Sequence, residues 1–449
     1  MSFKSKEAGK RDGFSSSTGF IIACIGSAVG MGNIWRFPTL VSSWGGLTFL
    51  IPYFIFVALI DSTGVIGEMA LGRAAGGGPV KAFGKCMEIA GGKKKIGSGI
   101  GMIPVIGSLA LAIGYTCVMG WIFKYAFMSF NGSMWNMGQD MEIIGGTFSK
   151  TAGAGGSTLW IIIAVSISCA IMIFGIAGGI ERVNKFMMPI LFLLFAILAV
   201  YILTLSGSKE GYKYIFTLNP DGLKSPMLWI YAFGQAFFSL SVAGNGTVIY
   251  GSYLSKKENI PRSAAIVAIF DTIAALLASI VIIPAMATGG AELSKGGPGL
   301  MFIYLVKVMN GMPGGRIVEI IFYICVAFAG VTSIINLYEV SVAYLQETFG
   351  ISRLKSSIFI HTLGGVCAVA IQAIVSGWMD VVSIYICPLG ALLAGIMFYW
   401  VAGKEFVLKS VNEGRQKSIG KWFFPLAKYV FCAAALIALI AGAFLGGIG

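Results

Sequence analysis

A short stretch inside the first long apolar run constrains the fold of this chain more than any other feature. It runs from Gly26 to Pro38 and reads GSAVGMGNIWRFP. Glycine weakens a helix and lets the backbone open. Amides and carbonyls opened at membrane depth are costly unless they are buried in protein or line a cavity. The stretch therefore predicts a broken helix whose free groups bind an ion or a carboxylate. The alternative is a kinked, passive helix with small residues for close packing.

The composition indicates a membrane protein with many spans. The chain has 449 residues, of which 57% are hydrophobic and 11% charged, and its mean hydropathy is +0.86. A soluble globular protein carries about 25% charged residues, so we expect the helix bundle itself to be the core. The eight cysteines are scattered and mostly lie in apolar runs, which argues against a disulfide framework. No cleavable signal peptide is expected, because the first apolar run is too long and too broken.

Runs of about 20 apolar residues predict eleven membrane helices. They are expected near residues 19–43, 47–72, 98–128, 157–176, 184–206, 227–254, 262–288, 316–346, 357–378, 381–403 and 421–447. Ten or twelve spans would mostly change the C-terminal end. Most lysines and arginines lie before the first span and in every second loop after it, which places the N-terminus inside and the C-terminus outside. This bias accounts for the net charge of +13 without a nucleic-acid partner.

A second interruption lies in the sixth predicted span, where residues Gly234 to Gly246 read GQAFFSLSVAGNG. This span opens a second set of five. Interrupted helices at matching positions in two halves indicate inverted repeats with a binding site between them. We therefore expect an all-α polytopic membrane protein with a 5+5 inverted-repeat bundle, in which helices 1 and 6 are unwound at mid-membrane. Residues 1–449 would form a single domain with a first repeat at about 19–206, an inverted second repeat at about 227–403 and an eleventh helix at 421–447.

Three separated motifs resemble the neurotransmitter:sodium symporter family. They are Gly26 to Pro38, Gly234 to Gly246, and Ala329 to Ser333. The resemblance runs in register from Arg11 to beyond Asp380, and the eleven-span form is similar to many bacterial members. It implies a protein of the bacterial cytoplasmic (inner) membrane that imports amino acids with Na⁺ by alternating access, and that is not an enzyme.

The resemblance also implies two sodium sites. The first would be formed by Ala28, Asn33, Ser239 and Asp271, and the second by Gly26, Val29, Ala329, Thr332 and Ser333. Carbonyl, amide, hydroxyl and carboxylate oxygens suit a hard cation. For Thr332 and Ser333, the alternative is a hydrogen bond back to their own helix.

By the same resemblance, the amino acid would lie between the two ions. Its carboxylate would meet the amides of Gly30, Met31 and Gly32 and the Tyr115 hydroxyl, and its amine would meet Ala28, Phe238 and Ser241. Its side chain would meet Leu111, Phe238, Ser239, Ala243, Gly244, Ser333 and Leu337, with Ser27 nearby. Monoamine-transporting members are expected to carry Asp at the position of Gly30, so this substrate should bring its own carboxylate. Gly244 stands where bacterial relatives have a large Phe or Met, which favours bulky hydrophobic or aromatic L-amino acids.

Two gates are implied as well. The outer gate would consist of Arg36, Asp380, Tyr115, Phe238 and Gln235, and the inner gate of Arg11, Phe14, Tyr253 and Glu347. The family usually has Asp at the position of Glu347. Gly179 and Pro189 resemble the family's unwinding motif in the fifth helix, which lets water reach the second sodium site.

Chloride is expected to be unnecessary. Animal members hold Cl⁻ near the first sodium ion, and Tyr53, Gln235 and Ser239 match part of that cage. The seventh-helix positions differ, because Asp271 replaces an Asn and Ala275 stands where relatives carry Glu or Ser. An ionised Asp271 would supply the negative charge directly. The alternative is a protonated Asp271 that behaves like the Asn it replaces.

Two other functions fit the same fold less well. A non-transporting amino-acid sensor often carries added cytosolic domains, whereas both termini here are short. An ion channel needs a continuous pore, and two gates around one site argue against it. The single histidine, His361, is expected to pack within its helix, and no Cys–His cluster suggests a structural metal site. The expected partners are an amino acid, sodium ions and membrane lipid, and the oligomeric state stays open.

Overall fold

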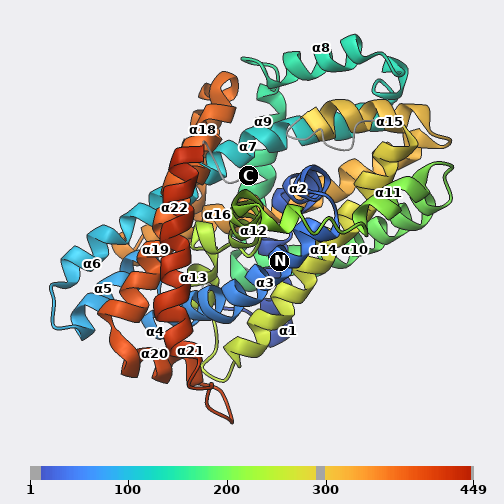
Figure 1. Cartoon of the computed structure of the whole chain (residues 1–449). Coiled ribbons are helices and arrows are strands. Elements are labelled where there is room, and N and C mark those ends of the chain that lie inside the picture. Colours follow the sequence, from blue (N-terminus) through green and yellow to red (C-terminus); the bar gives the residue numbers. More distant parts are fainter. Residues whose placement is uncertain (1–11, 290–298, 446–449) are drawn as a thin grey trace.

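The computed structural model describes residues 12–289 and 299–445, and within these ranges the regular elements are all helices (Figure 1). Seven helices of this described part are long and apolar enough to cross a membrane. The number is eight when the bent pair Ser17–Ala28 and Gly32–Trp44 is taken as one span. The predicted all-α polytopic membrane protein is confirmed.

The first half of the chain supplies five successive segments of the bundle. They are α1 (Ser17–Ala28) with η1 (Gly32–Arg36) and α2 (Phe37–Trp44); α3 (Leu47–Ile60) with η2 (Asp61–Val65) and α4 (Ile66–Ala75); α7 (Met102–Asn131); α9 (Thr158–Ile173); and η4 (Ile176–Ile180) with α10 (Glu181–Leu203). Shorter helices connect them: α5 (Pro79–Ile89), α6 (Lys94–Ile100), η3 (Trp135–Met137), α8 (Met141–Ala152), α11 (Ser208–Ile215) and η5 (Gly222–Lys224).

The second half supplies five more segments and a final helix. They are α12 (Pro226–Ser239) with η6 (Val242–Gly244) and α13 (Gly246–Gly251); α14 (Ile260–Thr288); α16 (Gly315–Phe349); α17 (Arg353–Ala370); the run of η8 (Gln372–Ile374), α18 (Val375–Val381), η9 (Val382–Ile386), α19 (Cys387–Gly395) and η10 (Ile396–Val401); and α21 (Phe423–Pro425), η11 (Leu426–Phe431) and α22 (Cys432–Leu445). The connecting helices described here are η7 (Leu300–Tyr304), α15 (Leu305–Gly311) and α20 (Gly403–Asn412).

Each of the main contacts between a helix of the first half and a helix of the second half has an equivalent contact with the two halves interchanged. α1 packs on α14, and α12 packs on α3, so the first segment of each half meets the second segment of the other. α7 packs on α16, and α9 packs on α17, so third meets third and fourth meets fourth. α10 packs on α1 and α16, and α19 packs on η6 and α7. Two five-segment repeats produce this pattern, as the matching helix breaks predict.

The boundary between the ninth and tenth predicted spans is wrong. The apolar pattern places it between residues 378 and 381, but α17 ends at Ala370 and the next run begins at Gln372. Gln372 is buried, and its Oε1 atom accepts hydrogen bonds from the Ser157 amide and hydroxyl at 3.1 Å each. These bonds hold the turn against the start of α9, whereas the surrounding apolar residues give no sign of a break.

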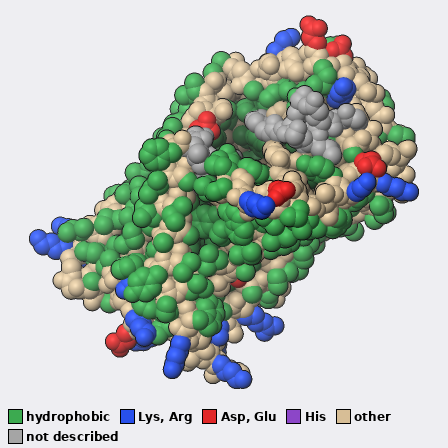
Figure 2. Space-filling model, viewed as in Figure 1, with side chains coloured by type: hydrophobic (Ala, Val, Ile, Leu, Met, Phe, Trp, Pro, Cys, Tyr) green, Lys and Arg blue, Asp and Glu red, His purple; other side chains and the backbone are tan. Residues whose placement is uncertain are grey.

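Apolar side chains cover much of the outer surface. Leu159, Phe174, Val200 and Ile317 are each more than half exposed, and Figure 2 shows a broad apolar face with Lys and Arg gathered toward its ends. Apolar patches of this extent are rare on soluble monomers and indicate contact with lipid.

Close packing between α4 and η10 requires a glycine at position 67. A Cβ atom there would lie 1.9 Å from the Tyr399 hydroxyl oxygen, which is buried and donates to the Thr63 carbonyl at 2.6 Å. Gly67→Ala should therefore cost about 1–3 kcal/mol through overpacking, seen as a lower melting temperature of the purified protein. Gly145→Ala in α8 is the control, because nothing lies within 4 Å of the added atom. Equal losses in both variants would contradict this packing.

Candidate functional site

The first helix break opens at Val29. α1 ends at Ala28, Val29 has an extended backbone (φ −71°, ψ 92°), and helical geometry resumes at Gly32. The Gly30 amide donates to Asn33 Oδ1 at 3.0 Å, so it is not free for a substrate carboxylate as the sequence interpretation assumed. A Cβ atom at position 30 would lie 2.3 Å from Ser333 Oγ, so a side chain there would displace this hydroxyl.

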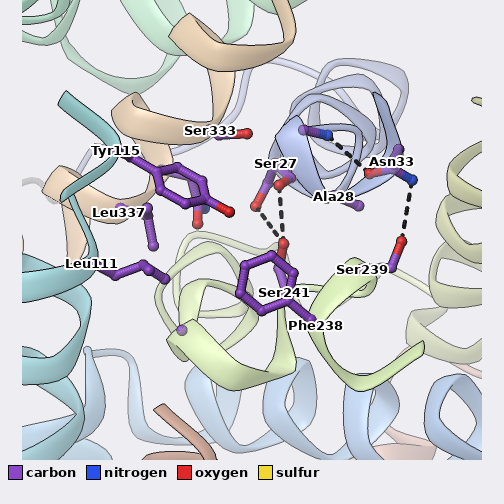
Figure 3. A pocket seen from close by; sticks show the side chains of 14 residues that line it. Ser27, Ala28, Asn33, Leu111, Tyr115, Phe238, Ser239, Ser241, Ser333 and Leu337 are labelled. Carbon is purple, nitrogen blue, oxygen red and sulfur yellow. Dashed lines mark hydrogen bonds between the residues drawn. The ribbon is translucent and has the colours of Figure 1, made fainter. Parts of the chain in front are cut away.

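The second break follows Ser239, where α12 ends. Ser241 and Asn245 have positive φ values of 58° and 51°, a strained conformation for residues other than glycine. The Ser241 hydroxyl donates to the Ser27 carbonyl oxygen at 2.9 Å (Figure 3). This bond joins the two breaks, because a side chain from the second break pairs a carbonyl at the first.

Three of the four residues predicted for the first sodium site form one hydrogen-bonded cluster. Asn33, Ser239 and Asp271 are buried. The Asn33 Nδ2 atom donates to Asp271 Oδ1 at 2.7 Å and to Ser239 Oγ at 3.1 Å (Figure 3 shows the latter), and Ser239 Oγ donates to Asp271 Oδ2 at 2.7 Å. The fourth residue, Ala28, lines the same pocket as Asn33 and Ser239.

The charge of Asp271 is not balanced by a neighbouring side chain. Among the residues that the structure describes, no lysine or arginine forms an ion pair with it. A buried carboxylate with only neutral partners requires a cation or a proton. The Asp271 carboxylate and the Ser239 hydroxyl supply oxygens that fit a hard cation such as Na⁺, and the Asn33 carboxamide, which now presents its Nδ2 atom, adds an oxygen if it rotates.

Four residues predicted for the second site, Gly26, Ala329, Thr332 and Ser333, also lie together. The Thr332 hydroxyl donates to the Phe328 and Ala329 carbonyls at 3.0 and 3.1 Å, and the Ser333 hydroxyl donates to the Ala329 carbonyl at 2.9 Å. Both hydroxyls thus bond back to their own helix, but the lone pairs of each oxygen can still accept a cation. A Cβ atom at Gly26 would lie 3.4 Å from Thr332 Cβ, so this glycine is adjacent to α16. Val29, three residues later in the sequence, is fully buried.

A small central pocket lies between the two breaks (Figure 3). Its cavity holds about 40 Å³, little more than one water molecule. The lining residues are Ser27, Ala28, Gly30, Gly32, Asn33, Leu111, Tyr115, Phe238, Ser239, Ser241, Gly244, Ser333, Asn336 and Leu337. Of the predicted substrate residues, Met31 lines the next cavity instead. Asn336 was missed, although it directly precedes the predicted Leu337.

Leu337 occupies part of the space that Gly244 was expected to free. A Cβ atom at position 244 would lie 3.2 Å from Leu337 Cδ2. A side chain at position 244 would therefore require a small shift of Leu337.

A larger cavity of about 330 Å³ lies beyond the central pocket. Its lining includes Met31, Trp35, Arg36, Tyr115, Trp121, Phe238, Met379 and Asp380. Tyr115 and Phe238 line both cavities, with ring centroids 6.5 Å apart, and therefore form the lid between them. The Arg36 guanidinium carbon lies 4.9 Å from the Phe238 ring centroid. Four of the five predicted outer-gate residues thus line one cavity, and Gln235 donates to the carbonyl of Gly32, which lines the same cavity, at 3.1 Å.

The opposite end of the bundle is closed by a network that the sequence did not reveal. Arg353 contacts Glu339 through both terminal nitrogens, at 3.0 and 2.7 Å, and the Tyr253 hydroxyl donates to the same carboxylate at 2.6 Å. Asp12 lies 3.8 Å from Arg353. Phe14 packs edge-on against the rings of Tyr253 and Tyr250.

The predicted inner gate is therefore only partly represented. Arg11 lies outside the described residues. Glu347 accepts hydrogen bonds from the Gly78 amide at 3.0 and 3.2 Å, and the Tyr253 hydroxyl donates to Glu339. The helix end at Gly350 separates Glu339 from Arg353 in sequence, so no helical spacing brings the two together.

Glu339→Gln should weaken this closure. It leaves the largely buried Arg353 without its carboxylate, and breaking a buried pair from one side costs about 3–5 kcal/mol. We expect a clear fall in the melting temperature of the purified protein. Asp221→Asn removes a solvent-exposed pair with Lys224 and should change stability by less than about 1 kcal/mol. A Glu339 variant as stable as the Asp221 variant would contradict the inner network.

Comparison with known proteins gives one consistent result. A family model described as "Sodium:neurotransmitter symporter family" matches residues 11–141 and 140–444. The uncharacterized sodium-dependent transporter YhdH of Bacillus subtilis is 30% identical over 95% of this chain and 96% of its own length. An uncharacterized sodium-dependent transporter of Methanocaldococcus jannaschii is 30% identical over 94% of this chain and 88% of its own.

A solved structure agrees in both fold and length. The crystal structure of MhsT in complex with L-phenylalanine superposes with a TM-score of 0.84 at 31% sequence identity, covering 96% of this chain and all of that one.

Proposed function

This chain belongs to the sodium:neurotransmitter symporter family, whose activity is Na⁺-coupled transport, and from that premise we propose that it imports bulky hydrophobic or aromatic L-amino acids together with two Na⁺ and without Cl⁻. The observation that carries the proposal is the buried cluster of Asn33, Ser239 and Asp271 beside a pocket formed by two helix breaks. The protein would lie in the bacterial cytoplasmic membrane with its N-terminus inside.

The first sodium ion would replace the hydrogen bonds within this cluster. Asp271 would contribute a negative charge, and Asn33 of η1 and Ser239 of α12 would contribute neutral oxygens. Because these residues come from three segments, the bound cation would draw both broken helices onto α14. The second ion would draw α1 onto α16 through Gly26, Val29, Ala329, Thr332 and Ser333.

The amino acid would bind across the breaks. The amides of Met31 and Gly32 suit its carboxylate, because Gly30 donates to Asn33 instead. Gly30 supplies no acidic side chain for the substrate amine, which supports a substrate with its own carboxylate. Leu111, Phe238, Leu337 and Gly244 give the remaining wall an apolar character. L-phenylalanine is bound by the similar MhsT, which supports the aromatic class.

Alternating access would use the two closures in turn. Tyr115 and Phe238 separate the substrate pocket from the outer cavity, and Arg36 and Asp380 lie above them. Glu339, Arg353 and Tyr253 close the cytoplasmic side. A pocket enclosed between two closures supports a transporter over a channel.

Membrane potential should drive uptake. Two Na⁺ and one zwitterion carry two charges, for which 100 mV supplies about 4.6 kcal/mol. This corresponds to roughly three decades of accumulation at about 1.36 kcal/mol per decade. L-phenylalanine uptake into proteoliposomes should rise with an inside-negative potential and stop when K⁺ replaces Na⁺. Uptake at full rate without Na⁺ would refute both sodium sites.

Chloride should be dispensable because Asp271 supplies the anionic charge beside the first ion. Uptake should be unchanged when gluconate replaces Cl⁻, and Asp271→Asn should abolish Na⁺-driven uptake or reduce it at least about tenfold, equivalent to about 1.4 kcal/mol. Ala275→Ser is the control, because it changes a neighbouring α14 residue without adding charge. A strict Cl⁻ requirement of the unmodified protein, or full activity of Asp271→Asn without chloride, would overturn this role.

Gly244 should set the size of the substrate. Gly244→Phe places a ring against Leu337, so L-phenylalanine should lose at least about tenfold in affinity, or about 1.4 kcal/mol, while L-alanine is much less affected. Competition binding with both amino acids on the purified protein measures the difference. If both weaken equally, Gly244 serves the helix break and does not determine selectivity.

A further inference from the structure

Asn184 of α10 has a buried oxygen that no hydrogen bond satisfies. The side chain is fully buried, and its Nδ2 atom donates to the Ile180 carbonyl at 2.8 Å. The Oδ1 atom has no hydrogen-bond partner. Buried polar atoms are nearly always paired, because leaving one unpaired is costly. An orphaned oxygen at this depth in a membrane bundle therefore points to a function.

This oxygen is directed at Gly26. A Cβ atom at position 26 would lie 1.7 Å from Asn184 Oδ1 and 3.4 Å from Thr332 Cβ. The amide oxygen therefore rests on the glycine backbone where α1, α10 and α16 meet. Gly26 and Thr332 are two of the residues in the proposed second sodium site, so the orphaned oxygen borders that site from a helix that contributes none of its expected ligands.

A second side-chain oxygen of α10 contacts α1 nearer to the start of that helix. Glu181 is one turn before Asn184, and a Cβ atom at Gly19 would lie 1.8 Å from its Oε1 atom. Its carboxylate accepts a hydrogen bond from the Ser15 amide at 2.7 Å and also binds Lys185. Gly19 and Gly26 are seven residues apart, about 10 Å along the helix. α10 thus presents oxygen atoms at two depths of its contact with α1, at positions where glycine lets them approach closely.

We propose that Asn184 Oδ1 is a sodium ligand on the cytoplasmic side of the second site. It would contact the ion together with Gly26 and Thr332, where α1, α10 and α16 meet. An amide oxygen is a suitable ligand for a hard cation, and this one can bind without first losing a hydrogen bond. The Nδ2 bond to Ile180 holds the carboxamide in place. The proposal rests on the proposed function, since it requires Na⁺ at the second site.

The test is the Na⁺ concentration that half-maximally stabilises the purified protein against heat, measured with NaCl against KCl at constant ionic strength. Asn184→Ala removes the oxygen and should raise this concentration roughly tenfold, the usual effect of losing a supporting group at a metal site. Asn184→Asp keeps the shape and adds a charge, so it should lower the concentration. Opposite shifts of the half-maximal Na⁺ concentration in the two variants distinguish a sodium ligand from a residue that only packs.

Asn310 provides the matched control. Its Oδ1 atom is also buried and without a partner, but it lies in α15, outside both proposed sodium sites. Asn310→Ala and Asn310→Asp should leave the Na⁺ dependence unchanged. The Asn184 proposal is overturned if both Asn184 variants keep the unmodified value or shift in the same direction, and Asn184→Asp alone decides if the alanine variant does not fold. Absence of any Na⁺ effect on the unmodified protein would instead refute the proposed function itself.

Discussion

Backbone opened in the middle of a membrane bundle must find partners, and here two openings face each other. Ser241 reaches from the break in α12 to the Ser27 carbonyl, and Asn33 accepts the Gly30 amide within the break in α1. Unpaired groups at this depth would be too costly to keep. Contact between the two breaks therefore stabilises both of them, and the central pocket lies between them.

The buried charge of Asp271 gives this arrangement its chemistry. Its hydrogen-bond partners, Asn33 and Ser239, are neutral and come one from each broken helix. A cation bound to this carboxylate also contacts residues of both breaks. Cation binding therefore fixes the relative positions of the two breaks and with them the shape of the pocket. This geometry gives a physical reason for coupling between Na⁺ and an amino acid that binds against the same opened backbone.

The sequence was sufficient for features that depend on composition and local pattern. The two breaks, most membrane segments and the residues of the first sodium cluster follow from glycine spacing, apolar length and family motifs. Pairings between distant segments leave no such pattern. The bond from Gln372 to α9 divides an unbroken apolar run, and the Glu339–Arg353 pair spans a helix end. The contact between Leu337 and the space beside Gly244 likewise joins two positions that are far apart in the chain.

The central claim is that Na⁺ and an amino acid complete one site between the two breaks. The most direct measurement is the melting temperature of the purified protein with each of the twenty amino acids, in NaCl and in KCl. Ligands that bind only the folded state raise this temperature in proportion to their occupancy. We predict stabilisation by bulky hydrophobic or aromatic amino acids in Na⁺ and little or none in K⁺. Equal stabilisation in both salts would contradict the shared site.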